Sequence, residues 1–259
     1  MEDSGPYAGV AKELSGSAFG AIRYLAETAS TNADAAALLG DDGARGLTIV
    51  AEHQTRGAGR KGRIWLDEPG TSLLFTAIVP RPLPAADLWI VPFWTVLGVR
   101  SALRECAVDA CVVWPNDVLV GQKKVAGVLC ASRVAGDTAW AACGVGINVR
   151  RPQRRLDVAP PPAYCSDVAP VERTQLLRAI LLAFDASLDS LTNPQRIARL
   201  WEGAANVPGA RYRLLADGTD EPFDATALQL ATGGGLVVVR DDGTRETVSL
   251  ADARALRKN

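Results

Sequence analysis

The stretch WPNDVLVGQKKVAGVL at residues 114–129 indicates the kind of sheet on which this protein is built. It belongs to a run of three expected strands, which are CVVWP at 111–115, KVAGVLCASRV at 124–134 and TAWAACGVGINV at 138–149. The connections carry Gly121-Gln122 and Gly136-Asp137, which are typical of tight turns. Because short turns join antiparallel neighbours, we expect an antiparallel meander.

The sequence on both sides of the meander predicts further strands and helices. Apolar runs predict strands at 21–25, 47–51 and 72–79, and helical spacing predicts helices at 86–105, 174–191 and 194–205. The segment STNADAAALLG at 30–40 is expected to form another helix, with hydroxyl caps at its start and glycine at its end. The proline-rich segment at 150–170 is expected to be a loop that crosses the surface.

The hydrophobic period changes from helical to alternating near Asn206, which predicts a domain boundary. Beyond this point the pattern predicts short strands, separated by turns at Asp217-Gly218, at three glycines at 233–235 and at Asp242-Gly243. We therefore expect residues 1–205 to form a catalytic domain and residues 206–259 to form a small β-barrel.

Composition argues against several classes of protein. The 28 Lys and Arg residues balance 29 Asp and Glu residues, so a net charge of -1 gives no overall attraction to nucleic acid or an anionic membrane. The single histidine, His53, and five cysteines without a C-x-x-C pair make a zinc site or a Ser-His-Asp triad hard to build. The acidic N-terminus lacks a secretory signal, and the apolar run at 88–99 is too short to span a bilayer, so we expect a soluble, cytoplasmic protein.

A second stretch, QTRGAGRKGRIW at 54–65, has the spacing G-x-G-x-x-G after an expected strand. A dinucleotide fingerprint needs a helix among the glycines, but Pro69 and Gly70 leave no room for one. A Walker A loop needs Lys-Ser/Thr where this chain has Arg63-Ile64. Taken alone, the stretch would fit a solvated basic turn equally well.

Four segments together resemble the biotin protein ligase family, in residues and in order. They are STN at 30–32, the glycine and arginine loop that ends in tryptophan at 65, WPND at 114–117 with a following lysine-x-AG, and GVGINV at 144–149. The resemblance implies an α+β fold with a mixed, largely antiparallel sheet and helices, similar to class II synthetases, plus a small C-terminal SH3-like β-barrel. It also implies the monofunctional type, because the catalytic sequence begins too early for the N-terminal helix-turn-helix of repressor versions.

The resemblance implies a two-step reaction with ATP and biotin as substrates and Mg²⁺ as an expected metal. The biotin carboxylate attacks the α-phosphate and gives biotinyl-5'-AMP and pyrophosphate. A lysine of a biotin carboxyl carrier domain, from acetyl-CoA carboxylase or a related carboxylase, then attacks the mixed anhydride. Because the first nucleophile is already an anion at neutral pH, the protein has to orient two anions and stabilise charge on phosphorus oxygens.

The family motifs, carried over residue by residue, imply three overlapping sets of site residues. The expected catalytic residues are Lys124, Arg60 and Arg63. The expected biotin contacts are Ser30, Thr31, Asn32, Gln54, Gly57, Ala58, Gly59, Arg60, Lys124 and Gly127. The expected nucleotide contacts are Arg60, Lys61, Arg63, Trp65, Asn116, Lys124 and Asn148. The one candidate magnesium ligand is Asp117.

Several of these residues fit a structural role as well. The STN segment could cap a helix, Trp65 could pack in the core rather than contact adenine, and Asn148 could simply end a strand. A Pro-Asn-Asp turn at 115–117 could fix a hairpin through side chain to backbone bonds. His53 is expected to pack beside its neighbour at 54 rather than to act as an acid or base.

The chain departs from the family pattern where Ala58 and Val113 replace the usual arginine and lysine, and where Ala131-Ser132 replaces an acid. The lost cations are expected to weaken nucleotide binding, with Arg56 as a replacement for one of them. Two rival functions stay open: a lipoate ligase or transferase of related fold, and a biotin sensor that has lost catalysis. A monomer and a homodimer are both compatible with the sequence, and the carrier domain is expected to dock partly by β-strand pairing.

Overall fold

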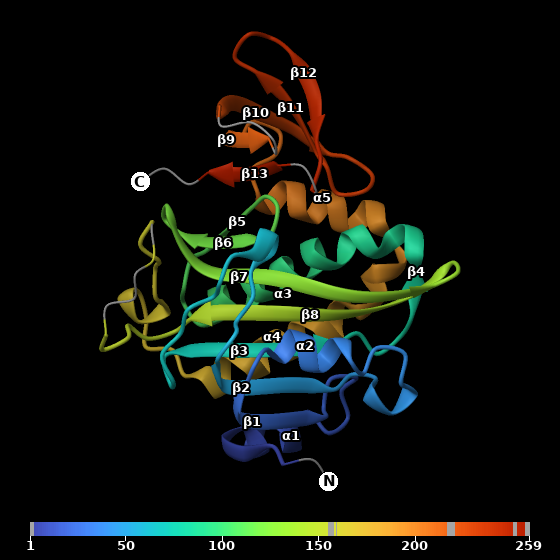
Figure 1. Ribbon diagram of the computed structural model, residues 1–259, viewed down its shortest axis with the longest axis vertical. Helices are drawn as coiled ribbons and strands as arrows, with labels where there is room; N and C mark the ends of the chain where they lie inside the picture. Colours follow the sequence, from blue (N-terminus) through green and yellow to red (C-terminus); the bar gives the residue numbers. More distant parts are fainter. Residues whose placement is uncertain (1–2, 155–157, 159, 217–220, 251–252, 257–259) are drawn as a thin grey trace.

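The computed structural model describes residues 3–154, 158, 160–216, 221–250 and 253–256. Within these residues the chain forms two sheets (Figure 1). The larger has the strand order β1-β2-β3-β8-β7-β6-β5, with β4 paired to β8, and the smaller has the order β12-β11-β10-β9-β13.

The larger sheet is mixed and largely antiparallel, as expected. Its strands are β1 (Ile22–Thr28), β2 (Thr48–Gln54), β3 (Ser72–Ile78), β4 (Leu83–Pro84), β5 (Cys111–Val113), β6 (Asp117–Val120), β7 (Lys123–Ala135) and β8 (Thr138–Asn148). Only β1 and β2 pair in parallel. The meander at 111–149 is confirmed, but it contains four strands rather than three, because Pro115 interrupts the first expected strand and β6 forms after it.

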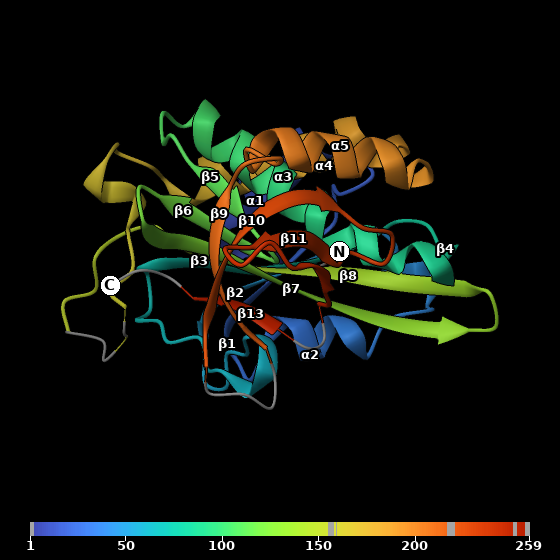
Figure 2. The ribbon, with the colours of Figure 1, turned by 90° about the horizontal axis from the view of Figure 1, so that it is seen from above.

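Helices cover both faces of the larger sheet. They are α1 (Ala8–Glu13), α2 (Thr31–Ala36), α3 (Val91–Glu105), α4 (Arg173–Ser187) and α5 (Pro194–Ala204). Short 3-10 helices lie at Gly5–Tyr7, Asp42–Ala44, Arg60–Gly62, Ala85–Ile90, Cys165–Asp167 and Leu188–Thr192. Figure 2 shows α3, α4 and α5 on one side of the sheet and α2 on the other. One face is therefore a closed core, and the other is only partly covered.

The closed face is packed with aromatic side chains between α3 and α4. The rings of Trp94 and Phe184 stack with centroids 4.6 Å apart, and Phe19 lies 5.8 Å from Phe184. The helical stretch Ala85–Glu105 is long and apolar enough to span a membrane by length and composition, which the sequence reading of 88–99 did not anticipate. More than half of its most apolar part is buried inside the protein, as is typical of a core helix.

Helix α2 differs from its prediction. It ends at Ala36 instead of reaching Gly40, and the Ser30 side chain at its N-cap position makes no capping hydrogen bond. The following residue, Thr31, is instead tied to Gln54 at the end of β2. The start of α2 is therefore held by the sheet rather than by its own cap.

The smaller sheet is antiparallel throughout, and the expected SH3-like barrel agrees with it. Its strands are β9 (Arg211–Ala216), β10 (Phe223–Leu230), β11 (Leu236–Arg240), β12 (Arg245–Val248) and β13 (Ala253–Leu256). The sequence predicted the first four, and β13 was missed. The Asp217-Gly218 turn lies outside the described residues.

Trp114 joins the two sheets. Its side chain is completely buried, and its indole Nε1–H donates to the backbone carbonyl of Gly234 at 3.1 Å. Its backbone N–H donates to the hydroxyl of Tyr212 on β9 at 3.2 Å. Burial raises the pKa of Tyr212 to about 12, so this hydroxyl stays neutral. The tryptophan of WPND thus packs at the junction rather than in a ligand site.

We expect Tyr212→Phe to lower the free energy of unfolding by about 1–3 kcal/mol, because the buried N–H of Trp114 loses its acceptor. Urea unfolding followed by far-UV circular dichroism measures this change. A midpoint equal to that of the unmodified protein would show that the bond contributes nothing to the junction.

Candidate functional site

A cavity of about 560 Å³ opens on the face of the sheet that carries α2. Residues from α2, β2, β3, β7 and β8 line it, together with the glycine loop, which we define as residues 55–66 between β2 and β3. Part of the proline-rich segment lines it as well. The cavity therefore collects segments that lie far apart in the sequence.

One end of the cavity is a chain of polar side chains. The Oε1 atom of Gln54 accepts from the backbone N–H of Thr31 at 2.8 Å and from its hydroxyl at 3.1 Å. The hydroxyl of Thr76 on β3 donates to that of Thr31 at 2.9 Å. Asn32 donates from Nδ2 to the carbonyl of Leu129 at 3.0 Å, while its buried Oδ1 has no hydrogen-bond partner among the described residues. An acceptor is thus available to a ligand at this end.

The floor of the cavity is formed by glycines that face each other on β7 and β8. Gly127 pairs with Gly146, and Leu129 pairs with Gly144. A Cβ atom on Gly146 would lie 2.8 Å from the indole of Trp65, and one on Gly144 would lie 2.9 Å from Oδ1 of Asn32. The space that these side chains would fill is occupied by the polar and aromatic groups of the site.

Lys124 lies beside this floor. Its Nζ is 2.6 Å from Oδ1 of Asp117 and 5.5 Å from the centroid of the Trp65 ring, and a Cβ on Gly127 would come within 2.6 Å of it. Both side chains of the ion pair are only about one-sixth exposed. The pair holds the ammonium group at the wall of the cavity, which Lys124 lines.

The glycine loop folds as a hairpin over the cavity. The N–H of Trp65 donates to the carbonyl of Gly57 at 2.9 Å, and the N–H of Gly59 donates to the carbonyl of Arg63 at 2.7 Å. The turn is made at Lys61 and Gly62, which have φ angles of 56° and 71°. The backbone amide of Gly59 is therefore already bonded within the loop.

Arg60 ties the glycine loop to the smaller sheet. Its guanidinium donates to the backbone carbonyl of Leu250, just after β12. Trp65, on the other arm of the hairpin, has a buried indole Nε1 with no partner among the described residues. An apolar ring and a hydrogen-bond donor thus face the cavity together.

The far end of the cavity contains residues that the sequence did not single out. Val158, Pro162 and Tyr164 line it, so the proline-rich segment does more than cross the surface. The N–H of Ala163 donates to the carbonyl of Lys124 at 2.9 Å, which fixes this segment to β7. Five prolines without a recognisable motif carry no local signal of such a contact.

Two asparagines connect the strands around the cavity. Asn116 is buried, and its Nδ2 donates to the carbonyl of Val128 at 2.5 Å. Asn148 donates from Nδ2 to the carbonyl of Lys124 at 3.3 Å. Both also line the cavity, so the structural and the ligand-binding readings of these residues are compatible.

Most of the expected site residues lie around this one cavity. They are Ser30, Thr31, Asn32, Gln54, Ala58, Gly59, Arg60, Arg63, Trp65, Asn116, Lys124, Gly127 and Asn148. Gly57, Lys61 and Asp117 do not line it. Gly57 packs behind Trp65, Lys61 is an exposed residue of the hairpin turn, and Asp117 contacts Lys124, which does line the cavity.

The departures from the family pattern differ in their position. Ala58 lines the cavity, so a cation there would have faced a ligand. Val113 and Arg56 are not among the lining residues, which argues against Arg56 as a replacement cation. His53 is half-buried and forms a hydrogen bond with Asp67, a contact that the sequence analysis did not predict.

The charged side chains among the described lining residues are all cations: Arg60, Arg63 and Lys124. Neither an acid nor a histidine lines the cavity within the described part of the chain. Such a cavity suits an anionic ligand, and it suits a reaction in which charge develops on oxygen without removal of a proton by a base.

The sequence matches the family model described as "Biotin/lipoate A/B protein ligase family" over residues 28–148. It is 29% identical over 246 residues to a biotin--[acetyl-CoA-carboxylase] ligase of Mycobacterium tuberculosis, covering 86% of this chain and 88% of that protein. It is 26% identical over 229 residues to the bifunctional ligase/repressor BirA of Bacillus subtilis, covering 85% of this chain and 70% of that protein.

The fold is similar to those of solved biotin protein ligases. The enzyme from Aquifex aeolicus in complex with biotin and ATP superposes with a TM-score of 0.73 at 23% identity, covering 92% of this chain and 99% of that chain. The Leishmania major enzyme with biotinyl-5-AMP gives a TM-score of 0.59 at 24% identity, covering 88% and 98%. At these identities the likeness establishes the fold.

We expect Gly146→Ala to displace Trp65 from the cavity floor, since the added Cβ would lie 2.8 Å from the indole. The overpacking should lower the free energy of unfolding by about 1–3 kcal/mol. The indole N–H resonance of Trp65, assigned with Trp65→Phe, should shift in a ¹⁵N-¹H spectrum. Gly203→Ala on α5 is the matched control, because no atom lies within 4 Å of its added Cβ. An unshifted Trp65 resonance in the Gly146 variant would contradict this description of the floor.

Proposed function

The chain belongs to the biotin/lipoate A/B protein ligase family, and we propose that it is a biotin protein ligase. It activates biotin with ATP as biotinyl-5'-AMP and transfers biotin to a lysine of a biotin carboxyl carrier domain. The observation that carries this proposal is a single cavity with a polar end, a glycine floor and a set of cations. These three parts match the chemistry of a ureido ring, an acyl chain and phosphate groups.

We assign the ureido ring of biotin to the polar end. Its carbonyl needs donors and its two N–H groups need acceptors in a pocket from which water is excluded. The hydroxyls of Ser30 and Thr31 can do either, and Oδ1 of Asn32 is a buried acceptor without a protein partner among the described residues. The valeryl chain then runs along Trp65, which covers Gly146, and the carboxylate points toward Lys124.

In the first step, a carboxylate oxygen of biotin forms a bond to the α-phosphorus and the bond to the bridging oxygen of the β-phosphate breaks. Pyrophosphate leaves with that electron pair. Lys124, Arg60 and Arg63 can neutralise the charge that builds on the phosphate oxygens, and their action needs no proton transfer. The Lys124–Asp117 pair pre-orients the ammonium group, so less ordering remains when the substrates bind.

In the second step, the neutral amine of the acceptor lysine attacks the acyl carbon of the anhydride. The bond from that carbon to the AMP oxygen breaks, AMP leaves as an anion, and the amide nitrogen releases a proton to solvent. The same cations can stabilise the departing phosphate. The adenine base has two aromatic surfaces available, Trp65 and Tyr164, of which Tyr164 lies within the proline-rich segment.

Mg²⁺ fits this site as a partner of ATP rather than as a resident metal. Among the described residues, no group of three or more His, Cys, Asp or Glu side chains could hold an ion. Asp117, the expected magnesium ligand, is paired with Lys124. Mg²⁺ commonly keeps several waters and binds to substrate phosphates with one or two carboxylates, so we propose that it enters with the nucleotide.

Two rival functions are less favoured. A lipoate ligase belongs to the same family, but the named relatives are biotin ligases. The buried Oδ1 of Asn32 needs a hydrogen-bond donor, and the dithiolane ring of lipoate has no N–H group to supply one. A sensor without catalysis was suggested by Ala58 and Val113. Val113 does not line the cavity, and three cationic side chains, Arg60, Arg63 and Lys124, do line it. The cavity therefore keeps the positive charge that catalysis needs.

We further propose a biotin carboxyl carrier domain as the protein partner, a cytoplasmic location, and residues 206–259 as a separate barrel domain. The smaller sheet begins at Arg211 and supports the boundary. The net charge of -1 supports a protein without a nucleic-acid partner. A monomer and a homodimer both remain compatible with the described fold.

We expect Lys124→Ala to lower the rate of biotin-dependent pyrophosphate exchange by about 100-fold or more, because the ammonium group near the reacting phosphate is lost. Lys123→Ala is the matched control, since Lys123 is the exposed neighbour on the same strand and should keep normal exchange. Near-normal exchange in the Lys124 variant, with a folded protein by circular dichroism, would refute the role assigned to this lysine.

We expect biotin with ATP to raise the melting temperature of the protein more than lipoate with ATP does, because only the native state binds the ligand. A thermal shift assay with each acid at equal concentration measures the difference. Stabilisation by lipoate alone would favour the rival ligase.

A further inference from the structure

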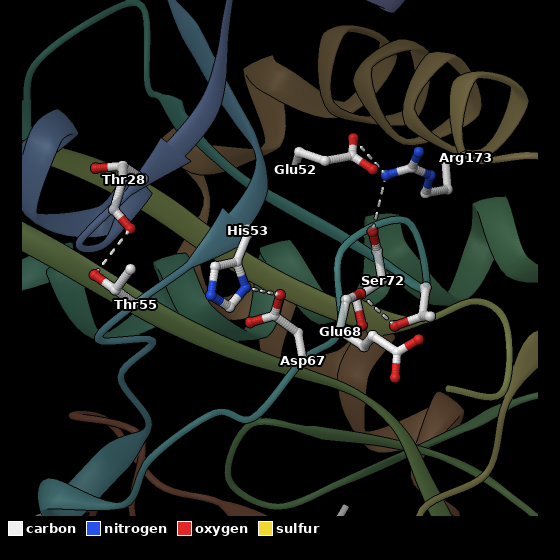
Figure 3. Close-up of polar contacts among 9 residues, drawn as sticks. Thr28, Glu52, His53, Thr55, Asp67, Glu68, Ser72 and Arg173 are labelled. Carbon is white, nitrogen blue, oxygen red and sulfur yellow. Dashed lines mark hydrogen bonds and ion pairs between the residues drawn. The ribbon is translucent and has the colours of Figure 1, made fainter. Parts of the chain in front are cut away.

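His53 and Asp67 form a buried pair at the base of the glycine loop. Gln54 is the last residue of β2, the loop occupies residues 55–66, and Asp67 follows it directly. Nδ1 of His53 lies 2.8 Å from Oδ2 of Asp67, and the two side chains are 28% and 1% exposed (Figure 3). The pair therefore joins the strand that enters the loop to the segment that leaves it.

In this pair His53 is the hydrogen-bond donor and Asp67 is the acceptor. An ionised carboxylate can only accept, so the ring nitrogen of His53 carries the hydrogen and donates it. Burial raises the pKa of Asp67, while the hydrogen bond from His53 acts in the opposite direction. A nearly inaccessible carboxylate without this donor would be costly to keep charged. Asp67 is thus bound to β2 through His53.

The pair is connected to the cavity on both sides but does not line it. On the entering side, Gln54 holds the start of α2 through its two bonds to Thr31. On the leaving side, Asp67 is two residues beyond Trp65, which covers Gly146 on the cavity floor. A change in the separation of His53 and Asp67 would therefore move a polar contact and an aromatic contact of the site together.

We propose that His53 and Asp67 are positioning residues, which hold the two ends of the glycine loop together and so keep the loop closed over the biotinyl-adenylate. This inference rests on the proposed function, since the adenylate is its ligand. The loop carries the cations that contact the phosphate, so an opened base would let the intermediate escape before transfer. The pair takes no proton in the reaction and acts only through Gln54 and Trp65.

The neighbouring residue Glu52 provides a matched control. It precedes His53 on β2, so its side chain points to the other face of the strand, where it pairs with Arg173 of α4 at 2.9 Å (Figure 3). Glu52 is also partly buried and ion-paired. Loss of this second pair removes a comparable contact without loosening the loop.

The experiment compares the full chain with His53→Phe, Asp67→Asn, the double variant and Glu52→Gln. Pre-formed biotinyl-adenylate is chased with unlabelled intermediate to give its dissociation rate. We expect each single variant at the pair to dissociate about tenfold faster, as for loss of a hydrogen bond to a charged group. The double variant should be no faster than the faster single variant, because the two residues act as one unit, and Glu52→Gln should match the unmodified protein.

A second measurement needs no ligand. Trypsin cleavage after Lys61, followed by mass spectrometry at a temperature well below unfolding, should be about tenfold faster in the two pair variants, because the hairpin opens more often. Rates within twofold of the unmodified protein in both assays, or an equal effect of Glu52→Gln, would overturn the inference. If the unmodified protein formed no adenylate, the proposed function would fail, and trypsin cleavage would still decide whether the pair holds the loop.

Discussion

Three glycines in β7 and β8 leave the middle of the larger sheet without side chains on one face, and the site is built on that opening. Gly127, Gly144 and Gly146 face the space that is filled by Lys124, Asn32 and Trp65, respectively. A Cβ atom at any of the three would come within 3 Å of one of these groups. The glycines of the motifs lysine-x-AG and GVGIN thus serve the same purpose. They leave room for ligand-binding groups in a tightly packed sheet.

Around this floor the protein supplies positive charge and hydrogen-bonding groups rather than acids and bases. The ammonium of Lys124 is held by Asp117, while Arg60 and Arg63 come from a hairpin whose ends are joined by His53 and Asp67. A site with cations in place of acids and bases suits a reaction in which the nucleophile is already ionised. It also accounts for a chain that carries a single histidine and places it at the base of a loop.

The sequence was most informative where a residue type is required by its immediate surroundings. Alternation and turn residues predicted the meander. The resemblance to the biotin protein ligase family, which rests on short motifs, predicted about half of the residues that line the cavity. The sequence was less informative where a partner lies far along the chain. Strand β6 was missed because Pro115 and Asn116 stand directly before it and interrupt the apolar pattern. The sequence also did not show that the start of helix α2 is held by Gln54 rather than by a local cap. Tyr164 and the His53–Asp67 pair were missed for the same reason, since tertiary contacts leave no periodic signal.

In the proposed reaction, biotin is joined to AMP in this cavity and then transferred to a protein lysine. The decisive measurement is mass spectrometry of a biotin carboxyl carrier domain after incubation with the protein, ATP and equal concentrations of biotin and lipoate. We expect the addition of one biotinyl group to one lysine of the carrier, only when ATP is present. A carrier that stays unmodified while the protein binds biotin and ATP, or one that gains a lipoyl group in preference to biotin, would refute the proposed reaction.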